Sequence, residues 1–127
     1  MSEATLAALR DQKYISLETF KKNGDGVKTP VWFVLHEGAV YLYTEATSWK
    51  VKRIRNNPRV RVAACSMRGV VKGPWIDGKA SMIEGDERRT ADRLLDRKYF
   101  MKTILNLLTR LNRHERTMIK IVSASIA

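Results

Sequence analysis

The residues with the clearest chemical meaning lie between positions 48 and 55. Ser48 suits the N-cap of a short helix, because its hydroxyl can accept a hydrogen bond from an early helical N–H. Lys50 and Lys52 follow in the first turn, with Arg53 and Arg55 just behind them. Positive side chains are unfavourable at a helix N-terminus, whose exposed N–H groups already carry partial positive charge. A bound anion such as phosphate would relieve that repulsion, so the segment predicts an anion-binding helix end.

The same segment also fits a simpler structure. Val51 and Ile54, three positions apart, can pack inward while Lys50 and Arg53 share another face. A short helix whose charged residues face water would have the same composition. The segment alone therefore leaves an anion site and a solvated basic helix both open.

The chain as a whole is strongly basic. It carries 24 Lys and Arg against 13 Asp and Glu, a net charge of +11 over 127 residues. Such a charge attracts nucleic acid, anionic membranes or polyanionic small ligands. Nucleic acid is disfavoured, because the aromatic residues lie in apolar strands and no recognition module is visible.

The length of the chain and its first residues limit the number of domains and the location that we expect. A chain of 127 residues predicts a single domain over residues 1–127. No apolar run is long enough to span a bilayer, and the first residues lack the pattern of a secretory signal. We therefore expect a cytoplasmic protein with no membrane partner.

Alternation and turn residues predict a mainly β chain. Residues 14–20, 29–35 and 39–44 have the pattern of three strands joined by short turns, which would form an antiparallel meander. Three more strands are predicted at residues 59–67, 71–83 and 116–122, the fifth with a bend near Trp75 and a bulge at Gly78. Helical spacing is expected at residues 2–10, after Ser48, and over residues 86–111. We expect an α+β fold in which six antiparallel strands form a closed or half-closed barrel with short flanking helices.

The sequence shows no catalytic or metal-binding motif. His36 and His114 are interpreted as solvated residues, and Cys65 as a packed thiol among small apolar neighbours. No paired cysteines, HExxH pattern or glycine-rich phosphate loop is present, so neither a metal site nor a catalytic side chain is predicted. A reaction on this chain would be carried by a bound cofactor.

Three segments in this order resemble the pyridoxamine-phosphate-oxidase-like split barrels, and among them the small actinobacterial flavin- or deazaflavin-dependent oxidoreductases. They are TPVWFVL at residues 29–35, LYTEATSWKVKRIRNNPRVRVAAC at residues 42–65 and VVKGPWIDGKA at residues 70–80. The resemblance implies a six-stranded split β-barrel. It also implies a homodimer with cofactor grooves between its subunits.

The resemblance further implies the residues of a cofactor site. The cofactor phosphate would meet Ser48, Lys50 and Lys52, in agreement with the anion-binding helix end. Trp75 would reach the cofactor ring from the other subunit. The ring and ribityl contacts would come from two strands: Thr29, Pro30, Val31 and Trp32 for the ring, and Tyr43 and Thr44 for the ribityl chain. Trp32, Tyr43 and Trp75 would serve equally well as barrel core.

One departure from the family pattern bears on the cofactor. Relatives that bind FMN as oxidases often have an arginine where this chain has Trp49. The chain looks more like the branch that uses coenzyme F420, a deazaflavin with a phosphate and a polyglutamate tail, whose carboxylates suit a basic protein. The resemblance therefore implies a reductase that transfers hydride between F420 and a small unsaturated or heteroaromatic substrate, with a proton from solvent, Tyr43 or Lys79. The alternatives are an FMN-binding oxidase-like protein, and a carrier that holds a flavin, haem-like or lipid ligand without turnover.

Overall fold

The computed structural model of the chain describes residues 2–99 and 116–123. Within them, the helices are α1 (Glu3–Leu9), α2 (Trp49–Asn56) and α3 (Gly85–Lys98). The strands are β1 (Tyr14–Phe20), β2 (Gly26–Val31), β3 (Val34–His36), β4 (Ala39–Glu45), β5 (Arg59–Cys65), β6 (Ile76–Ile83) and β7 (Arg116–Ser123). All seven strands belong to one antiparallel sheet in the order β2-β1-β5-β6-β7-β4-β3.

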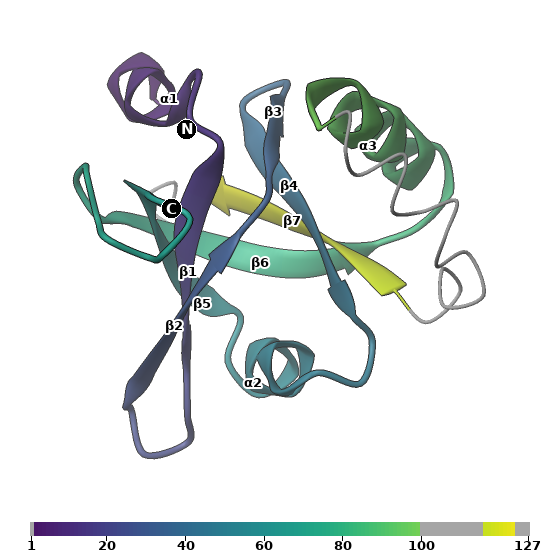
Figure 1. Cartoon of the computed structure of the whole chain (residues 1–127). Coiled ribbons are helices and arrows are strands. Elements are labelled where there is room, and N and C mark those ends of the chain that lie inside the picture. The colour runs from purple at the N-terminus through teal and green to yellow at the C-terminus, as the bar shows by residue number, and fades with distance from the viewer. Residues whose placement is uncertain (1, 100–115, 124–127) are drawn as a thin grey trace.

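The strand order explains the shape of the sheet. β2 and β3 are its two edge strands, yet only Trp32 and Phe33 separate them in the sequence. Two residues span only about 7 Å, so the sheet must curl until its edges approach one another. Figure 1 shows this curl, with α2 below the curled sheet beside the β1–β2 hairpin and α3 against the outside of β3 and β4. The predicted fold class, an α+β split barrel with short flanking helices, is confirmed.

Alternating apolar residues fill the inside of the barrel. Ile15 and Leu17 of β1 face inward, and Val60, Val62 and Ala64 of β5 do the same. All five are 3% exposed or less, as the alternation along these strands predicts for residues that share a face. This inner cluster fixes the register of the central strands, because a slip of one residue would turn each apolar side chain outward.

A second cluster lies between the sheet and α3. Ala91 and Leu95 of α3 pack there against Tyr41 and Met118, and Trp32 and Tyr43 join at its margin. A polar contact closes one side: the Tyr41 hydroxyl donates to Glu87 at 2.6 Å, and the Lys120 ammonium lies 2.5 Å from the same carboxylate oxygen. The hydrogen bonds from Lys120 and Tyr41 lower the pKa of Glu87. The outer face of β4 and β7 is therefore used to hold α3.

The structure divides one predicted strand into two. Residues 29–35 were expected to form a single strand, but β2 ends at Val31 and β3 begins at Val34. The Tyr99 hydroxyl, from beyond the end of α3, accepts a hydrogen bond from the Phe33 N–H at 3.1 Å, which holds the break. The sheet accordingly has seven strands in the described residues, where six were predicted.

The predicted meander is wrong. β1 lies between β2 and β5, and β4 lies between β3 and β7, so the first strands form two separate hairpins. The predicted bulge at Gly78 is also wrong, because the pairing of β6 with β5 and β7 runs through Gly78 without an extra residue. The fifth predicted strand starts later than expected, at Ile76, which leaves Trp75 in the preceding loop. Most of the predicted helical stretch after residue 99, together with His114, lies outside the described residues.

Candidate functional site

The N-terminus of α2 has the geometry that its sequence predicts. Ser48 is the N-cap, with extended backbone angles, and its Oγ accepts a hydrogen bond from the Val51 N–H at 3.3 Å. The Thr44 hydroxyl at the end of β4 lies 3.2 Å from the Ser48 hydroxyl. Val51 and Ile54 are buried beneath the helix, Lys52 and Arg55 are exposed, and Lys50 and Arg53 are half-buried. Two hydroxyls and the early N–H groups of α2 therefore gather at one point, as an anion-binding helix end requires.

Lys50 is the most informative residue of this helix end. Its side chain is half-buried, and burial together with the neighbouring Arg53 lowers its pKa, which Glu45 offsets only in part. No hydrogen bond or ion pair holds the Lys50 ammonium in the part of the chain that the structure describes. A half-buried cation without a bound counter-charge is costly, and an anion at the helix end would remove that cost.

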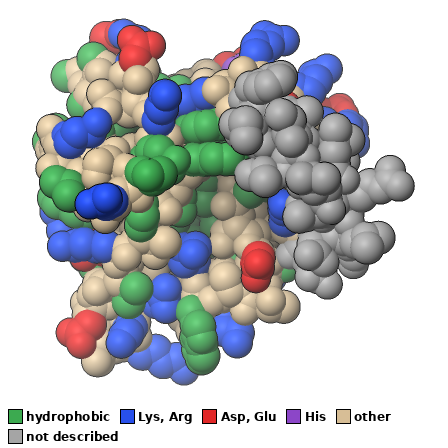
Figure 2. Space-filling model, viewed as in Figure 1, with side chains coloured by type: hydrophobic (Ala, Val, Ile, Leu, Met, Phe, Trp, Pro, Cys, Tyr) green, Lys and Arg blue, Asp and Glu red, His purple; other side chains and the backbone are tan. Residues whose placement is uncertain are grey.

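A basic groove adjoins this helix end. It runs between α2 and the start of the β1–β2 hairpin, and its lining residues include two aromatic rings and four cations but no carboxylate: Phe20, Lys21, Lys22, Trp49, Lys52, Arg53 and Asn56. Trp49 is 69% exposed, with the Lys52 ammonium 4.3 Å from its ring centroid. The Arg53 Nε donates to the Thr19 hydroxyl at 2.7 Å, which fixes that guanidinium against β1. Figure 2 shows Lys and Arg side chains crowded over this lower part of the molecule.

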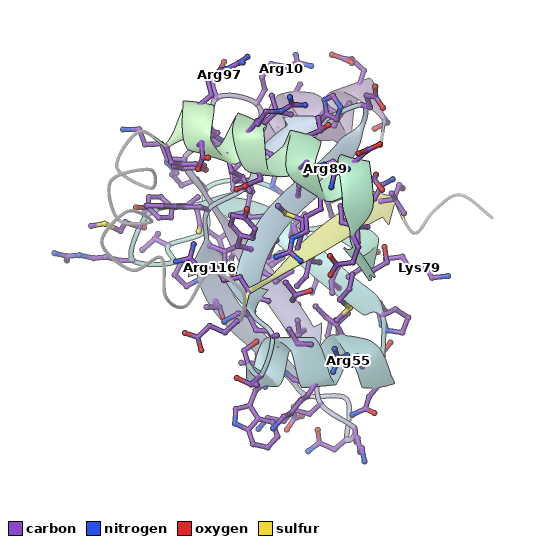
Figure 3. All side chains as sticks on the ribbon, turned by 90° about the vertical axis from the view of Figure 1, so that its right-hand side faces the viewer. Arg10, Arg55, Lys79, Arg89, Arg97 and Arg116 are labelled. Carbon is purple, nitrogen blue, oxygen red and sulfur yellow. The ribbon has the colours of Figure 1, made fainter. Side chains whose placement is uncertain are left out.

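Basic residues also occur on other faces. Figure 3 shows Arg55 on α2, Arg89 and Arg97 on α3, and Lys79 pointing outward from β6. The high net charge therefore belongs to the whole surface. The groove differs in that four cations line one pocket together with the exposed Trp49, whose ring lies under the Lys52 ammonium.

Trp32 and Tyr43 share a second location, beneath α3. Trp32 stacks on Tyr99, with ring centroids 4.7 Å apart and planes 8° from parallel. The Tyr43 hydroxyl donates to Asp92 of α3. Burial and that carboxylate raise the pKa of Tyr43 far above its ordinary value, so Tyr43 is a weak acid and a poor source of protons. Both aromatic rings are part of the packing that holds α3.

The predicted residues of β2 point to alternate sides of the sheet. Thr29 and Val31 are half-buried, and Val31 packs against the inner cluster, whereas Pro30 is exposed. On β1, Leu17 pairs with Thr29, Ser16 with Pro30 and Ile15 with Val31. One strand therefore presents Thr29 and Val31 to the barrel and Pro30 to the outside.

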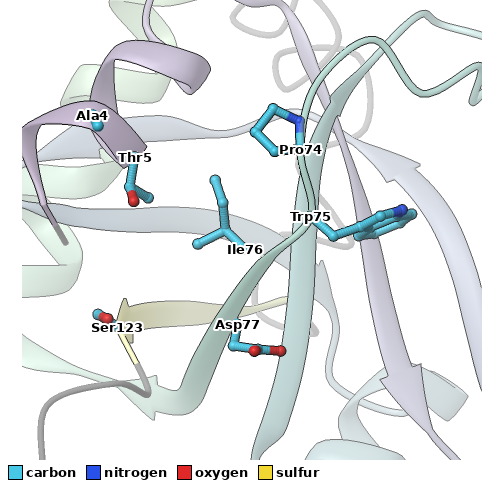
Figure 4. A pocket seen from close by; sticks show the side chains of 7 residues that line it. All are labelled: Ala4, Thr5, Pro74, Trp75, Ile76, Asp77 and Ser123. Atoms are coloured by element: carbon cyan, nitrogen blue, oxygen red, sulfur yellow. The ribbon is translucent and has the colours of Figure 1, made fainter.

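Trp75 lies in the loop just before β6. Its ring has the Lys28 ammonium at 5.2 Å and the Arg61 guanidinium at 5.0 Å from its centroid. A shallow pocket lies beside it, formed by α1, the start of β6 and the end of β7: Ala4, Thr5, Pro74, Trp75, Ile76, Asp77 and Ser123. Figure 4 shows the Trp75 indole on the opposite side of the strand from Ile76. The ring thus turns from the pocket toward the basic residues of β2 and β5.

The structure brings together only part of the predicted site. Thr44 and Ser48 meet at the α2 N-terminus, Lys50 follows in the first turn of the helix, and Lys52 lines the groove. Of the other predicted residues, Trp32 and Tyr43 pack beneath α3, residues 29–31 lie on β2, and the Trp75 ring lies near Lys28 of that same strand. Sequence reasoning missed that Lys21 and Lys22 face α2. Their position just before the Asn23-Gly24 turn was visible, but their approach to a helix 27 residues later was not.

The curled antiparallel sheet with short flanking helices is a split barrel, and the basic, serine-capped helix α2 lies at one end of it. The chain belongs to the family described as pyridoxamine 5'-phosphate oxidase, whose model matches residues 1–126. No curated protein sequence matches the chain.

Solved structures with low sequence identity share the fold. A conserved hypothetical protein from Mycobacterium tuberculosis is 22% identical, with a TM-score of 0.72, over 98% of this chain and 81% of that one. The heme storage protein HutZ from Vibrio cholerae is 15% identical, with a TM-score of 0.71, over 97% and 90% of the two chains. A FAD-binding protein from Mesorhizobium loti is 15% identical, with a TM-score of 0.66, over 98% and 90%.

The described residues contain no group of three or more His, Cys, Asp or Glu side chains placed to hold a metal ion. Of the helices in residues 2–99, none has both the length and the hydropathy needed to cross a membrane.

Proposed function

We propose that this protein is an oxidoreductase that binds a phosphate-bearing flavin or deazaflavin cofactor at the N-terminus of α2, with coenzyme F420 as the preferred form. The observation that carries the proposal is the half-buried Lys50 ammonium, which forms no ion pair in the described chain and belongs to the first turn after the Ser48 cap. Family membership supports a cofactor of this kind, and a structural neighbour from Mesorhizobium loti is a FAD-binding protein.

The basic groove supports F420 over FMN. The two cofactors share a phosphate, but F420 adds the carboxylates of its tail. Lys21, Lys22 and Arg53 offer three cations in the groove besides Lys52, which is proposed to meet the phosphate. Trp49, which replaces the arginine of FMN-binding relatives, gives the groove an aromatic wall but no phosphate-binding guanidinium.

The cofactor would supply the redox chemistry, a hydride at its ring, and the protein would hold and shield it. Ser48, Lys50 and Lys52 would bind the phosphate, with Thr44 close to the ribityl chain. Thr29 and Val31 would face the ring from β2, and Pro30 lies between them on the opposite side of that strand. Trp32, Tyr43 and Trp75 remain proposed ring and ribityl neighbours, although each already has a packing role in the single chain. The substrate would be a small unsaturated or heteroaromatic molecule.

Titration with F420 and with FMN tests this proposal directly. Trp49 is the exposed tryptophan of the groove, so we expect F420 to quench tryptophan fluorescence and Trp49→Phe to reduce that change, with the rest coming from Trp32 and Trp75. FMN is expected to bind more weakly. Tighter binding of FMN would place the protein with the oxidase-like relatives, and binding of neither would refute the proposal. Oxidation of reduced F420 in the presence of candidate acceptors then separates an enzyme from a carrier.

A haem carrier is the second candidate. It is favoured by one observation, the shared fold with the heme storage protein HutZ from Vibrio cholerae. Among the described residues, His36 ends β3 with a side chain 3.7 Å from Glu37 and does not face the α2 groove. A haem titration followed by absorbance, beside the F420 titration, decides between the two.

We further propose that the protein acts as a homodimer with its cofactor groove between subunits. Support comes from the loop after β5, where Met67, Val70 and Val71 are exposed apolar side chains close together in the sequence. Sedimentation at micromolar concentration should give the mass of two chains, and Val70→Glu should shift it toward one. A wild-type protein with the mass of a single chain would contradict both the dimer and the shared groove.

A further inference from the structure

The basic groove beside α2 contains aromatic rings as well as cations. Trp49 begins α2 and is 69% exposed, and Phe20, at the end of β1, is half-buried. Trp49 is thus an exception to the expectation that the aromatic residues lie in apolar strands, which weighed against nucleic acid. The Lys52 ammonium lies over its ring, 4.3 Å from the centroid, and most of the residue remains open to solvent. The groove therefore offers a flat apolar surface among positive charges.

The cations of the groove are available to a ligand. Within residues 2–99 and 116–123, Lys21, Lys22 and Lys52 form no ion pair. Arg53 donates its Nε to the neutral Thr19 hydroxyl, which orients the guanidinium without compensating its charge. A polyanion in the groove would therefore meet positive charges that no acidic side chain of the described chain neutralises.

The combination of rings and cations selects among polyanions. A bilayer surface is broad and flat, whereas these cations line a groove between α2 and the β1–β2 hairpin. An acidic peptide would meet the cations, but its carboxylates offer no ring to stack on Trp49. Each unpaired nucleotide has both a phosphate and a base with two open faces, and stacking of bases on aromatic side chains contributes strongly to the binding of single strands. Single-stranded nucleic acid is therefore the polyanion that fits both features of the groove.

We propose that the basic groove binds single-stranded nucleic acid, with a base stacked on Trp49 and phosphates held by the four cations. The stacked base would cover the exposed part of the indole, and the Lys52 ammonium beside it would bind the adjacent phosphate. Such a strand needs no cofactor at Ser48 and Lys50, so its binding is a function beyond the proposed one. The two ligands would share the groove cations and therefore could not occupy the groove together.

Fluorescence anisotropy of the whole chain with a labelled oligothymidylate of about eight nucleotides tests the proposal. We expect affinity that falls with salt, with a slope of log K against log salt of roughly −3, because four cations meet phosphates. A strand with the same phosphates but no bases should bind about tenfold more weakly, since it cannot stack. Equal affinity for the two strands would overturn the proposal, because it would show attraction to phosphate alone.

Variants assign the contacts to the groove. Trp49→Ala should weaken the binding of oligothymidylate about tenfold and leave the affinity for the strand without bases nearly unchanged. Lys21→Gln combined with Lys22→Gln should reduce the salt slope by about 1.4, the contribution of two phosphate contacts. Lys79→Gln is the matched control, because Lys79 points outward from β6 and does not line the groove, and it should leave the slope nearly unchanged. Equal effects of the Lys79 variant and the double variant would refute a site in the groove.

Binding of a strand and binding of the cofactor are tested separately. If oligothymidylate binds with these properties but neither F420 nor FMN binds, the proposed function fails and the nucleic-acid site stands. If F420 binds but oligothymidylate shows no affinity even at low salt, the nucleic-acid site is wrong and the cofactor site stands.

Discussion

Lys50→Ala is expected to weaken cofactor binding by about ten- to a hundredfold, the effect of removing one charge-assisted contact to a phosphate. The loss should exceed that of a typical surface charge because Lys50 is half-buried and its ammonium has no ion pair in the described chain. Fluorescence titration of wild type and variant with the same cofactor measures the ratio of the two dissociation constants.

The pH dependence of binding adds a second readout. In the free protein, burial and then Arg53 lower the pKa of Lys50, so its charge is lost at a lower pH than that of an ordinary lysine. A bound phosphate favours the protonated amine and raises that pKa. The affinity of wild type should therefore fall as pH rises through the lowered pKa of the free protein. Lys50→Ala should lack this step.

Arg55→Ala is the matched control for Lys50→Ala. It removes one positive charge from the same helix, but Arg55 is exposed on α2 and does not line the groove. We expect a change in affinity of less than about threefold, because exposed charges are well screened. Similar losses in both variants would indicate diffuse attraction by a basic helix. Unchanged affinity in Lys50→Ala would show that the phosphate binds elsewhere.

Local features of the sequence predicted the α2 helix end well. The Ser48 cap, the buried pair Val51 and Ile54, and the end of the helix before Pro58 all depend on neighbours within one or two turns. The inward set Val60, Val62 and Ala64 was equally readable, because alternation is a property of a single strand. The fold class and these elements therefore followed from short-range patterns.

Long-range contacts explain what the sequence did not reveal. The apolar run at residues 29–35 looks like one strand, and its break depends on Tyr99, 66 residues after Phe33. The same contact places Trp32 beneath α3. The groove likewise needs Lys21 and Lys22 to meet Lys52, a pairing that no local pattern encodes. Alternation and capping rules describe single elements, so they carry no information on which distant elements meet.

Gly78→Val is expected to lower the free energy of unfolding by about 3 kcal/mol or more and the melting temperature by roughly 10 °C. A Cβ at Gly78 would lie 2.5 Å from the Ile121 Cγ2 atom and 3.2 Å from the Val122 carbonyl oxygen. β6 is paired on both sides, to β5 and β7, so the backbone has little room to move away. Chemical denaturation of the purified variant measures the loss. For a small domain, this is a large fraction of the total stability.

The clash can be assigned to one methyl group. Ile121→Leu keeps the apolar volume but removes the Cγ2 branch, so Gly78→Ala should cost clearly less in that background than in wild type. Gly73→Ala is the control, because its new Cβ would meet only the Ala64 Cβ at an ordinary 3.7 Å, and we expect a change within about 0.5 kcal/mol. Equal costs of Gly78→Ala with and without Ile121→Leu would show that the glycine is needed for the backbone of β6. If Gly78→Ala costs less stability in the Ile121→Leu background, the absence of a side chain at Gly78 is what allows Ile121 of β7 to pack against β6.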